Sequence, residues 1–198
     1  MSDDAESDDA DLDRAAAALA DGDLVVYPTE TVYGLGANAV DAAAVERVFE
    51  AKGRDRDNPV SLAVPDVEAA LQYASPTAEE RRFMHEFLPG PVTVVVERKT
   101  VVPDVLTAGR DRVGIRVPDH DLALALLERF EPITATSANV SGTGSVRELS
   151  ELGEPVRAAA AVLLDGGRTP GGGSTVVDVS AGEIVRRGAL ADEIDAWL

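Results

Sequence analysis

The segment LVVYPTETVYGLG at residues 24–36 joins a short apolar run to a polar turn that contains two glycines. The run at residues 24–27 predicts a buried strand, and Pro28 ends it because proline cannot donate a hydrogen bond to a neighbouring strand. The hydroxyl groups and glycines that follow suit a bound ligand, since sheets flanked by helices bind ligands where their strands end. A plain β-turn explains the same residues, and the segment alone leaves both interpretations open.

Outward from this segment, short apolar runs alternate with helical stretches, and two strands sometimes follow one another directly. Strands are expected at residues 24–27, 60–64, 92–96, 113–117, 133–136, 161–164, 175–179 and 183–187. Helices are expected at residues 12–20, 42–51, 67–73, 75–87, 122–130 and 191–198. The last two strands predict a closing hairpin. This order favours an α/β (α+β) fold in which a mixed β-sheet is flanked by helices.

The domain organisation predicted from the sequence is simple. Residues 1–11, MSDDAESDDAD, hold six acidic side chains and predict a flexible, solvated acidic tail. Residues 12–198 contain no linker or internal repeat and predict a single domain. No apolar run approaches the ~20 residues needed to cross a bilayer, and the acidic start differs from a signal peptide. A cytoplasmic location is therefore expected.

Composition excludes several classes of protein. The chain has no cysteine and only two histidines, which excludes disulfide scaffolds, cysteine nucleophiles and multi-histidine metal sites. The formal charge of −18 argues against broad nucleic-acid binding, which needs a basic face. Acidic residues number 36 against 18 basic ones, and only Lys52 and Lys99 are lysines. This pattern is typical of halophilic proteins, and we expect the chain to lose structure when salt is removed.

A cluster of cations lies in the segment KGRDRDNP at residues 52–59, where Lys52, Arg54 and Arg56 fall within five residues. A lysine is notable in a chain with so few of them. Lysine offers phosphate a point charge and arginine offers it a fork of donors, so the cluster suits a phosphate group. A solvated basic loop that offsets nearby aspartates is the competing interpretation.

A further arginine, Arg116, lies within the apolar strand VGIRVP at residues 113–118. Strand alternation predicts that its side chain points to the face opposite Ile115 and Val117. A cation there needs an anion, which is either a ligand or an aspartate in a salt bridge.

Two other segments end predicted strands or precede them. The segment TATSANVSG at residues 134–142 offers small hydroxyl groups and an amide for hydrogen bonds to a ligand. The segment GGGST at residues 171–175 leaves backbone amides free for an anion, although a flexible hairpin loop is the alternative. The pattern GxxxxGK[ST] is absent from the sequence, which excludes the common phosphate loop.

Together these segments resemble one family. PTETVYGLG, KGRDRDNP, VGIRVP, TSANVSG, GGSTVVD and IVRRG occur in the order seen in the YrdC-like threonylcarbamoyl-AMP synthases, from about Leu12 to Gly188. The resemblance implies a twisted mixed sheet flanked by helices, with a concave charged cavity. Because the sequence ends at Leu198, it resembles the short form of the family with a single catalytic domain.

The resemblance also implies a reaction. L-Threonine, bicarbonate and ATP would give threonylcarbamoyl-AMP and pyrophosphate, which makes the chain a nucleotidyltransferase that serves tRNA threonylcarbamoyl-adenosine modification. Mg²⁺ would arrive with ATP, and a downstream tRNA threonylcarbamoyl transferase complex would be the partner. Neither membrane association nor stable nucleic-acid binding is expected. Carbamoylation of another substrate on the same fold, and an RNA-binding module, are the alternatives.

Carried over by motif, the resemblance implies three sets of residues and no metal ligand from the chain. The catalytic residues would be Lys52 and Arg54. The residues that bind L-threonine would be Thr31, Arg116, Ser137 and Ser174. The residues that bind ATP would be Lys52, Arg54, Asn58, Asn139, Ser145, Arg147 and Arg186.

Overall fold

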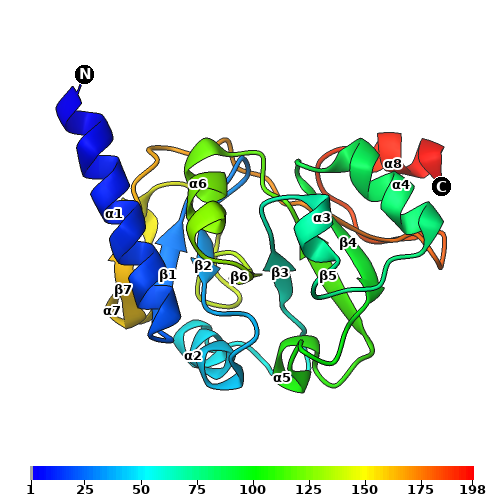
Figure 1. Ribbon diagram of the computed structural model, residues 1–198, viewed down its shortest axis with the longest axis horizontal. Helices are drawn as coiled ribbons and strands as arrows, with labels where there is room; N and C mark the ends of the chain where they lie inside the picture. The colour runs from blue at the N-terminus through cyan, green and yellow to red at the C-terminus, as the bar shows by residue number, and fades with distance from the viewer. Residues whose placement is uncertain (1) are drawn as a thin grey trace.

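The computed structural model describes the backbone of residues 2–198 and the side chains of residues 9–198. Its strands form a three-stranded and a six-stranded sheet (Figure 1). The first has the order β2 (Gly34–Gly36), β1 (Leu24–Tyr27) and β7 (Ala160–Leu163). The second has the order β6 (Ile133–Ala135), β3 (Ser61–Ala63), β5 (Arg112–Arg116), β4 (Val92–Glu97), β8 (Thr175–Asp178) and β9 (Glu183–Arg186).

The two sheets meet where β2 lies beside β6 (Figure 1). The Leu35 N–H donates to the Thr136 carbonyl at 2.8 Å, and the Thr134 N–H donates to the Ala37 carbonyl at 2.9 Å. The Thr134 hydroxyl adds a bond of 2.8 Å to the Leu35 carbonyl, inside the sheet where a free hydroxyl would be costly. These bonds join the two sheets into one twisted surface.

Parallel and antiparallel pairs are mixed in both sheets, as the sequence predicts. The pairs β1/β7, β3/β5 and β4/β8 are parallel, and β1/β2, β3/β6, β4/β5 and β8/β9 are antiparallel. The β8/β9 pair confirms the predicted closing hairpin.

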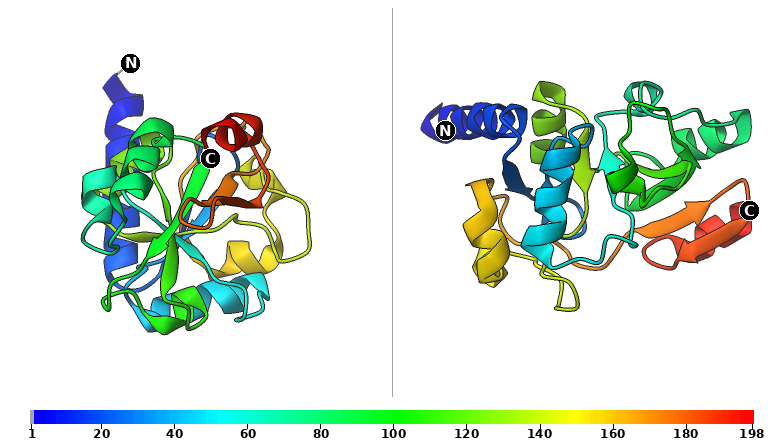
Figure 2. Two further views of the ribbon diagram at one scale, coloured as in Figure 1. Left: turned by 90° about the vertical axis from the view of Figure 1, so that its right-hand side faces the viewer. Right: turned by 90° about the horizontal axis from the view of Figure 1, so that it is seen from below.

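Helices cover both faces of the three-stranded sheet (Figure 2). The helices α1 (Ser2–Ala20) and α6 (Asp121–Arg129) pack on one face, and α2 (Ala42–Lys52) and α7 (Glu154–Ala159) pack on the other. Strand β1 supplies both cores because its side chains alternate: Val25 and Tyr27 join the α1/α6 core, and Leu24 and Val26 join the α2 core.

A separate core lies on one face of the six-stranded sheet. It is built from Val92, Val94 and Val96 of β4 and from side chains of α3 (Val67–Ala70), α4 (Ala78–Phe87), α5 (Asp104–Thr107) and α8 (Ala191–Trp197). The Phe83 ring stacks on Phe87 and meets Trp197 edge-on, which ties α8 to α4. In the described part of the chain, no such layer of helices covers the opposite face of β4, β5 and β8, which forms the floor of a cavity.

The first helix is longer than the sequence predicted. Helix α1 begins at Ser2, whereas a helix was predicted only from residue 12; the flexibility predicted for residues 1–11 stays a prediction, and Met1 lies outside the described residues. Arg129 on α6 donates to Asp9, and also to Asp13 at 2.9 Å. These ion pairs draw the acidic helix onto α6, a tertiary contact that an acidic composition does not reveal.

Four short elements of the structure were not predicted from the sequence. Strand β2, helix α5, helix α7 and the 3₁₀ turn at Leu149–Glu151 had not been predicted, and α3 is shorter than the predicted helix at residues 67–73. Each spans a few residues and depends on its neighbours for packing. None of the helices in the described part of the chain has the length and apolar character needed to span a membrane.

Candidate active site

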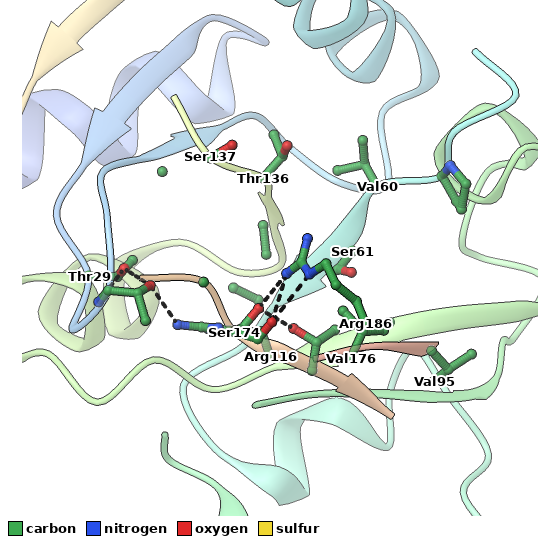
Figure 3. Close-up of a pocket in the computed structure, with 18 of the residues that line it drawn as sticks. Thr29, Val60, Ser61, Val95, Arg116, Thr136, Ser137, Ser174, Val176 and Arg186 are labelled. Carbon is green, nitrogen blue, oxygen red and sulfur yellow. Dashed lines mark hydrogen bonds between the residues drawn. The ribbon is translucent and has the colours of Figure 1, made fainter. Parts of the chain in front are cut away.

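A cavity of about 830 Å³ lies over the six-stranded sheet and extends to the loop that follows β1 (Figure 3). Strand alternation decides which side chains face it. The positions that face it from β4, β5 and β8 are Thr93, Val95, Arg112, Gly114, Arg116, Val176 and Asp178, whereas Val94, Ile115 and Val177 between them pack in the core. A Cβ atom at Gly114 would lie 2.3 Å from the Ser61 hydroxyl, so glycine keeps the floor flat.

Most of the site residues predicted from the sequence line this one cavity. They are Thr31, Arg54, Arg116, Ser137, Ser145, Ser174 and Arg186. They come from segments far apart in the chain, and the crossing of these segments over the sheet brings them together. Among the described residues, the other four lie outside the lining: Lys52, Asn58, Asn139 and Arg147.

The four residues outside the lining have other partners. Asn58 is exposed, and its carbonyl accepts from Arg54 Nε at 3.1 Å. The Asn139 amide donates to the Val140 and Thr143 carbonyls at 2.8 and 3.0 Å. Arg147 Nε donates to the Thr169 carbonyl at 3.1 Å. The Lys52 ammonium donates to the carbonyls of Ser137 and Asn139, which places it behind the cavity wall.

Arg116 closes one end of the cavity and is almost fully buried. Its Nη2 donates to Glu30 Oε1 at 2.7 Å and to the Thr31 hydroxyl at 3.2 Å. The Thr31 hydroxyl also lies 3.0 Å from that of Thr29. The carboxylate partner is thus a glutamate from the segment at residues 28–36, where the sequence argument considered an aspartate. One Nη2 satisfies both contacts, so the rest of the guanidinium fork is left for a ligand.

Ser174 lies on the floor of the cavity and is held by Arg186 (Figure 3). Arg186 Nη2 donates to the Ser174 hydroxyl at 2.9 Å and to its carbonyl at 3.0 Å. The Ser174 hydroxyl lies 3.3 Å from that of Thr93. A Cβ at Gly188 would lie 2.3 Å from the Gly173 carbonyl oxygen, so the motif that carries Arg186 needs glycine to pack against this loop.

Several arginines line the cavity, and three of them have no carboxylate partner among the described side chains. Among the residues with described side chains, Arg54, Arg110 and Arg186 donate to carbonyl or hydroxyl oxygens and to no carboxylate. Burial lowers the pKa of Arg54, and the charge of Arg186 lowers it further. Burial and the charge of Arg116 likewise lower the pKa of Arg186. In a chain of net charge −18, unpaired arginines grouped in one hollow form a site for an anion.

The acids near the cavity do not form a site for a resident metal ion. Asp178 accepts from Arg112 at 3.0 Å and from Ser180 at 2.7 Å. Within residues 9–198, no three histidine, aspartate or glutamate side chains lie close enough together to hold a metal ion.

Sequence reasoning missed several residues of the site. Glu30 lies between two threonines that the motif already offered, but its role depends on Arg116, which is 86 residues away. Thr93 is the polar residue inside the strand VTVVVE, and that was its only signal. Arg110 and Arg112 also line the cavity, and neither was among the site residues predicted from the sequence.

Comparison with known proteins gives a consistent result. A family model described as Sua5_yciO_yrdC, telomere recombination, matches residues 17–188. The chain is 44% identical over 169 residues to the threonylcarbamoyl-AMP synthase of Pyrococcus abyssi, a match that covers 84% of this chain and 50% of that protein. It is 38% identical over 202 residues to the Bacillus subtilis protein of the same name, with 98% of this chain and 58% of that protein covered. The chain thus spans about half the length of these relatives.

Solved structures agree with the sequence comparison. The P. abyssi Sua5 structure complexed with L-threonine aligns with a TM-score of 0.87 and 41% identity, covering 93% of this chain and 56% of that one. The structure of Escherichia coli YciO aligns with a TM-score of 0.81 and 26% identity, covering 90% of this chain and 89% of that one. These alignments confirm the predicted fold class, and with the family match they show that the chain belongs to the Sua5/YciO/YrdC family.

Proposed function

We propose that this chain is a nucleotidyltransferase that converts L-threonine, bicarbonate and ATP into threonylcarbamoyl-AMP and pyrophosphate. One observation carries the proposal: a single cavity joins a buried arginine beside hydroxyl groups to a wall of arginines without carboxylate partners. The first part suits an amino acid and the second suits a polyphosphate. The relatives named threonylcarbamoyl-AMP synthase support the same reaction.

The amino-acid end of the proposed site is built around Arg116. Its free N–H groups would pair with the threonine carboxylate in two parallel hydrogen bonds. Thr31 and Ser174 would offer hydroxyl groups to the rest of the amino acid, and Ser137 would reach it from the opposite wall. The ion pair with Glu30 holds the arginine in place before the substrate arrives.

The nucleotide end is built around Arg54 and Arg186. Both guanidinium groups are partly buried, and burial, followed by repulsion from a neighbouring arginine, lowers the pKa of each. A triphosphate would relieve that repulsion and take up their remaining donors. Valine side chains of the lining, Val60, Val95, Val176 and Val185, offer apolar contact to the nucleoside.

The proposed chemistry needs no enzyme nucleophile. The threonine amine attacks the carbon of bicarbonate, water leaves, and a carbamate forms. A carbamate oxygen then attacks the α-phosphorus of ATP as the bond to pyrophosphate breaks. The chain would hold both substrates in line and place cations opposite the charge that develops on the phosphates. Mg²⁺ would enter on the phosphates of ATP, since the described residues offer it no site of their own.

The product would feed the threonylcarbamoyl-adenosine modification of tRNA. A downstream tRNA threonylcarbamoyl transferase complex would accept the mixed anhydride, whose hydrolysis makes rapid handover advantageous. The cytoplasmic location predicted from the sequence stays a prediction.

Pyrophosphate release tests the proposal. We expect release from ATP that requires both L-threonine and bicarbonate, measured at molar KCl. Release with threonine replaced by another carbamoyl acceptor would instead favour a different reaction on this fold. Release that ignores bicarbonate would overturn the proposal.

A further inference from the structure

Lys52 ends helix α2 and is 1% exposed, yet its charge has no carboxylate partner among the described side chains. Its ammonium donates to the Asn139 carbonyl at 2.6 Å and to the Ser137 carbonyl. The Lys52 carbonyl accepts from the Ser141 N–H at 2.8 Å. The lysine is therefore bound to the turn at residues 137–141 through both its side chain and its backbone.

The next two residues turn the chain away from Lys52. Gly53 has a φ of +57°, the left-handed conformation that ends α2, and its N–H bonds to the last turn of the helix. Arg54 then reaches the cavity and donates to the Pro59 carbonyl at 2.9 Å. Lys52 and Arg54 belong to one motif in sequence, but they lie on opposite sides of the cavity wall.

The turn that Lys52 holds carries a residue of the cavity. Ser137 lines the cavity, and its hydroxyl donates to the Asn139 side-chain oxygen. The Asn139 amide in turn donates to the Thr143 carbonyl at 3.0 Å. A buried ammonium needs acceptors, and the two carbonyls supply them, so ammonium and turn stabilise each other.

We propose that Lys52 is a positioning residue, whose ammonium fixes the turn at residues 137–141 so that the Ser137 hydroxyl faces the bound amino acid. This inference rests on the proposed function and gives Lys52 a role different from a direct phosphate contact. In that role the lysine acts through Ser137, and the two residues form one functional unit.

A double-mutant cycle separates positioning of Ser137 by Lys52 from a direct contact of Lys52 with phosphate. Lys52→Met removes the donors and Ser137→Ala removes the hydroxyl. We expect each single variant to raise the KM for threonine about tenfold and to leave the KM for ATP unchanged. We expect the double variant to raise the KM for threonine no more than the more impaired single variant does. Independent effects that multiply, or a raised KM for ATP, would overturn the proposal.

Lys52→Gln provides a second test, because an amide retains two N–H donors without the charge. We expect its threonine KM to lie nearer to wild type than that of Lys52→Met. A glutamine variant whose KM for threonine is raised as much as that of the methionine variant would mean that the charge matters and would contradict positioning. Lys99→Met is the matched control, since Lys99 is exposed and donates to the Leu71 carbonyl away from the cavity.

Amide hydrogen exchange keeps the inference testable if the enzyme assay shows no activity. We expect faster exchange at the Ser141 amide in Lys52→Met than in wild type or Lys99→Met. Unchanged exchange there would overturn the positioning contact. Wild-type chain that fails to release pyrophosphate with threonine and bicarbonate would overturn the proposed function instead.

Discussion

Glu30 gives Arg116 a carboxylate partner and still leaves donors free on the guanidinium. The second oxygen of Glu30, Oε2, is buried and makes no hydrogen bond among the described residues. A guanidinium held on one side by a carboxylate keeps its fork oriented toward the cavity, which favours planar recognition of a second carboxylate. At the scale of single residues, this pair defines the amino-acid end of the site.

Arg116→Lys is expected to weaken threonine binding about tenfold while the fold survives. The lysine ammonium can still pair with Glu30, but it lacks the fork that a carboxylate accepts in two bonds. Titration calorimetry with L-threonine measures the change. Arg157→Lys is the control, because Arg157 is exposed and donates to the Leu149 carbonyl away from the cavity. Unaltered threonine affinity in Arg116→Lys would contradict the assignment.

Lys52 makes a prediction about pH. Burial, and then the charge of Arg54, lower the pKa of Lys52 from 10.5 to about 8. Between these values the unfolded chain binds a proton that the folded chain lacks, so the free energy of unfolding rises with pH, by at most about 3 kcal/mol. Lys52→Met should remove this rise between pH 8 and 10, as measured by chemical denaturation. Equal slopes in wild type and variant would show that the lysine is not destabilised in this way.

At the scale of elements, the hairpin of β8 and β9 holds one wall of the cavity together. Arg186 on β9 bonds to Ser174 just before β8, and the Gly188 N–H donates to the Thr175 hydroxyl at 3.0 Å. The same hydroxyl donates to the Ala189 carbonyl at 2.5 Å. The two motifs at the end of the chain are therefore two sides of one hairpin, and Ser174 depends on both.

Gly188→Ala should destabilise this hairpin. Its Cβ would meet the backbone of Gly173 and Ser174, which cannot rotate away as a side chain can. Overpacking of this kind costs about 1–3 kcal/mol, and the displaced Ser174 should also raise the threonine KM. Thermal denaturation and steady-state kinetics measure both effects.

Gly144→Ala is the matched control for that change, because a Cβ there meets no atom within 4 Å. We expect it to change stability by less than about 0.5 kcal/mol. If both alanine variants proved equally stable, close packing would not be the reason for Gly188.

At the scale of the whole molecule, a strongly acidic surface surrounds a basic cavity. The net charge is −18, and many arginines outside the cavity pair with acids, as Arg129 does with Asp13. Mutual repulsion of the remaining carboxylates opposes compaction at low salt and is screened at high salt.

Thermal stability should therefore rise with salt. At ~1 M salt the Debye length falls to ~3 Å, against ~10 Å at 0.1 M, so the repulsion is screened. We expect the Tm to increase between dilute buffer and molar KCl, as followed by circular dichroism. A Tm that stays constant over this range would contradict the halophilic interpretation.

The sequence by itself determined the class of fold and several of the polar residues that line the cavity. Apolar runs bounded by proline or glycine marked β1, β5 and the β8/β9 hairpin, because buried strands need such runs and turns need such residues. The polar segments at the ends of those strands contained Thr31, Arg116 and Ser174, which the structure brings into one cavity.

Tertiary structure alone decided how these segments meet. Local periodicity carries no information about which strands are neighbours. The contact between β2 and β6, where the two sheets meet, could therefore not be predicted. The pairing of Arg116 with Glu30, and the opposite directions of Lys52 and Arg54, likewise depend on contacts between distant parts of the chain. The physical reason is that a buried charge takes whichever partner the fold brings within hydrogen-bond distance, and only the packed sheet determines that partner.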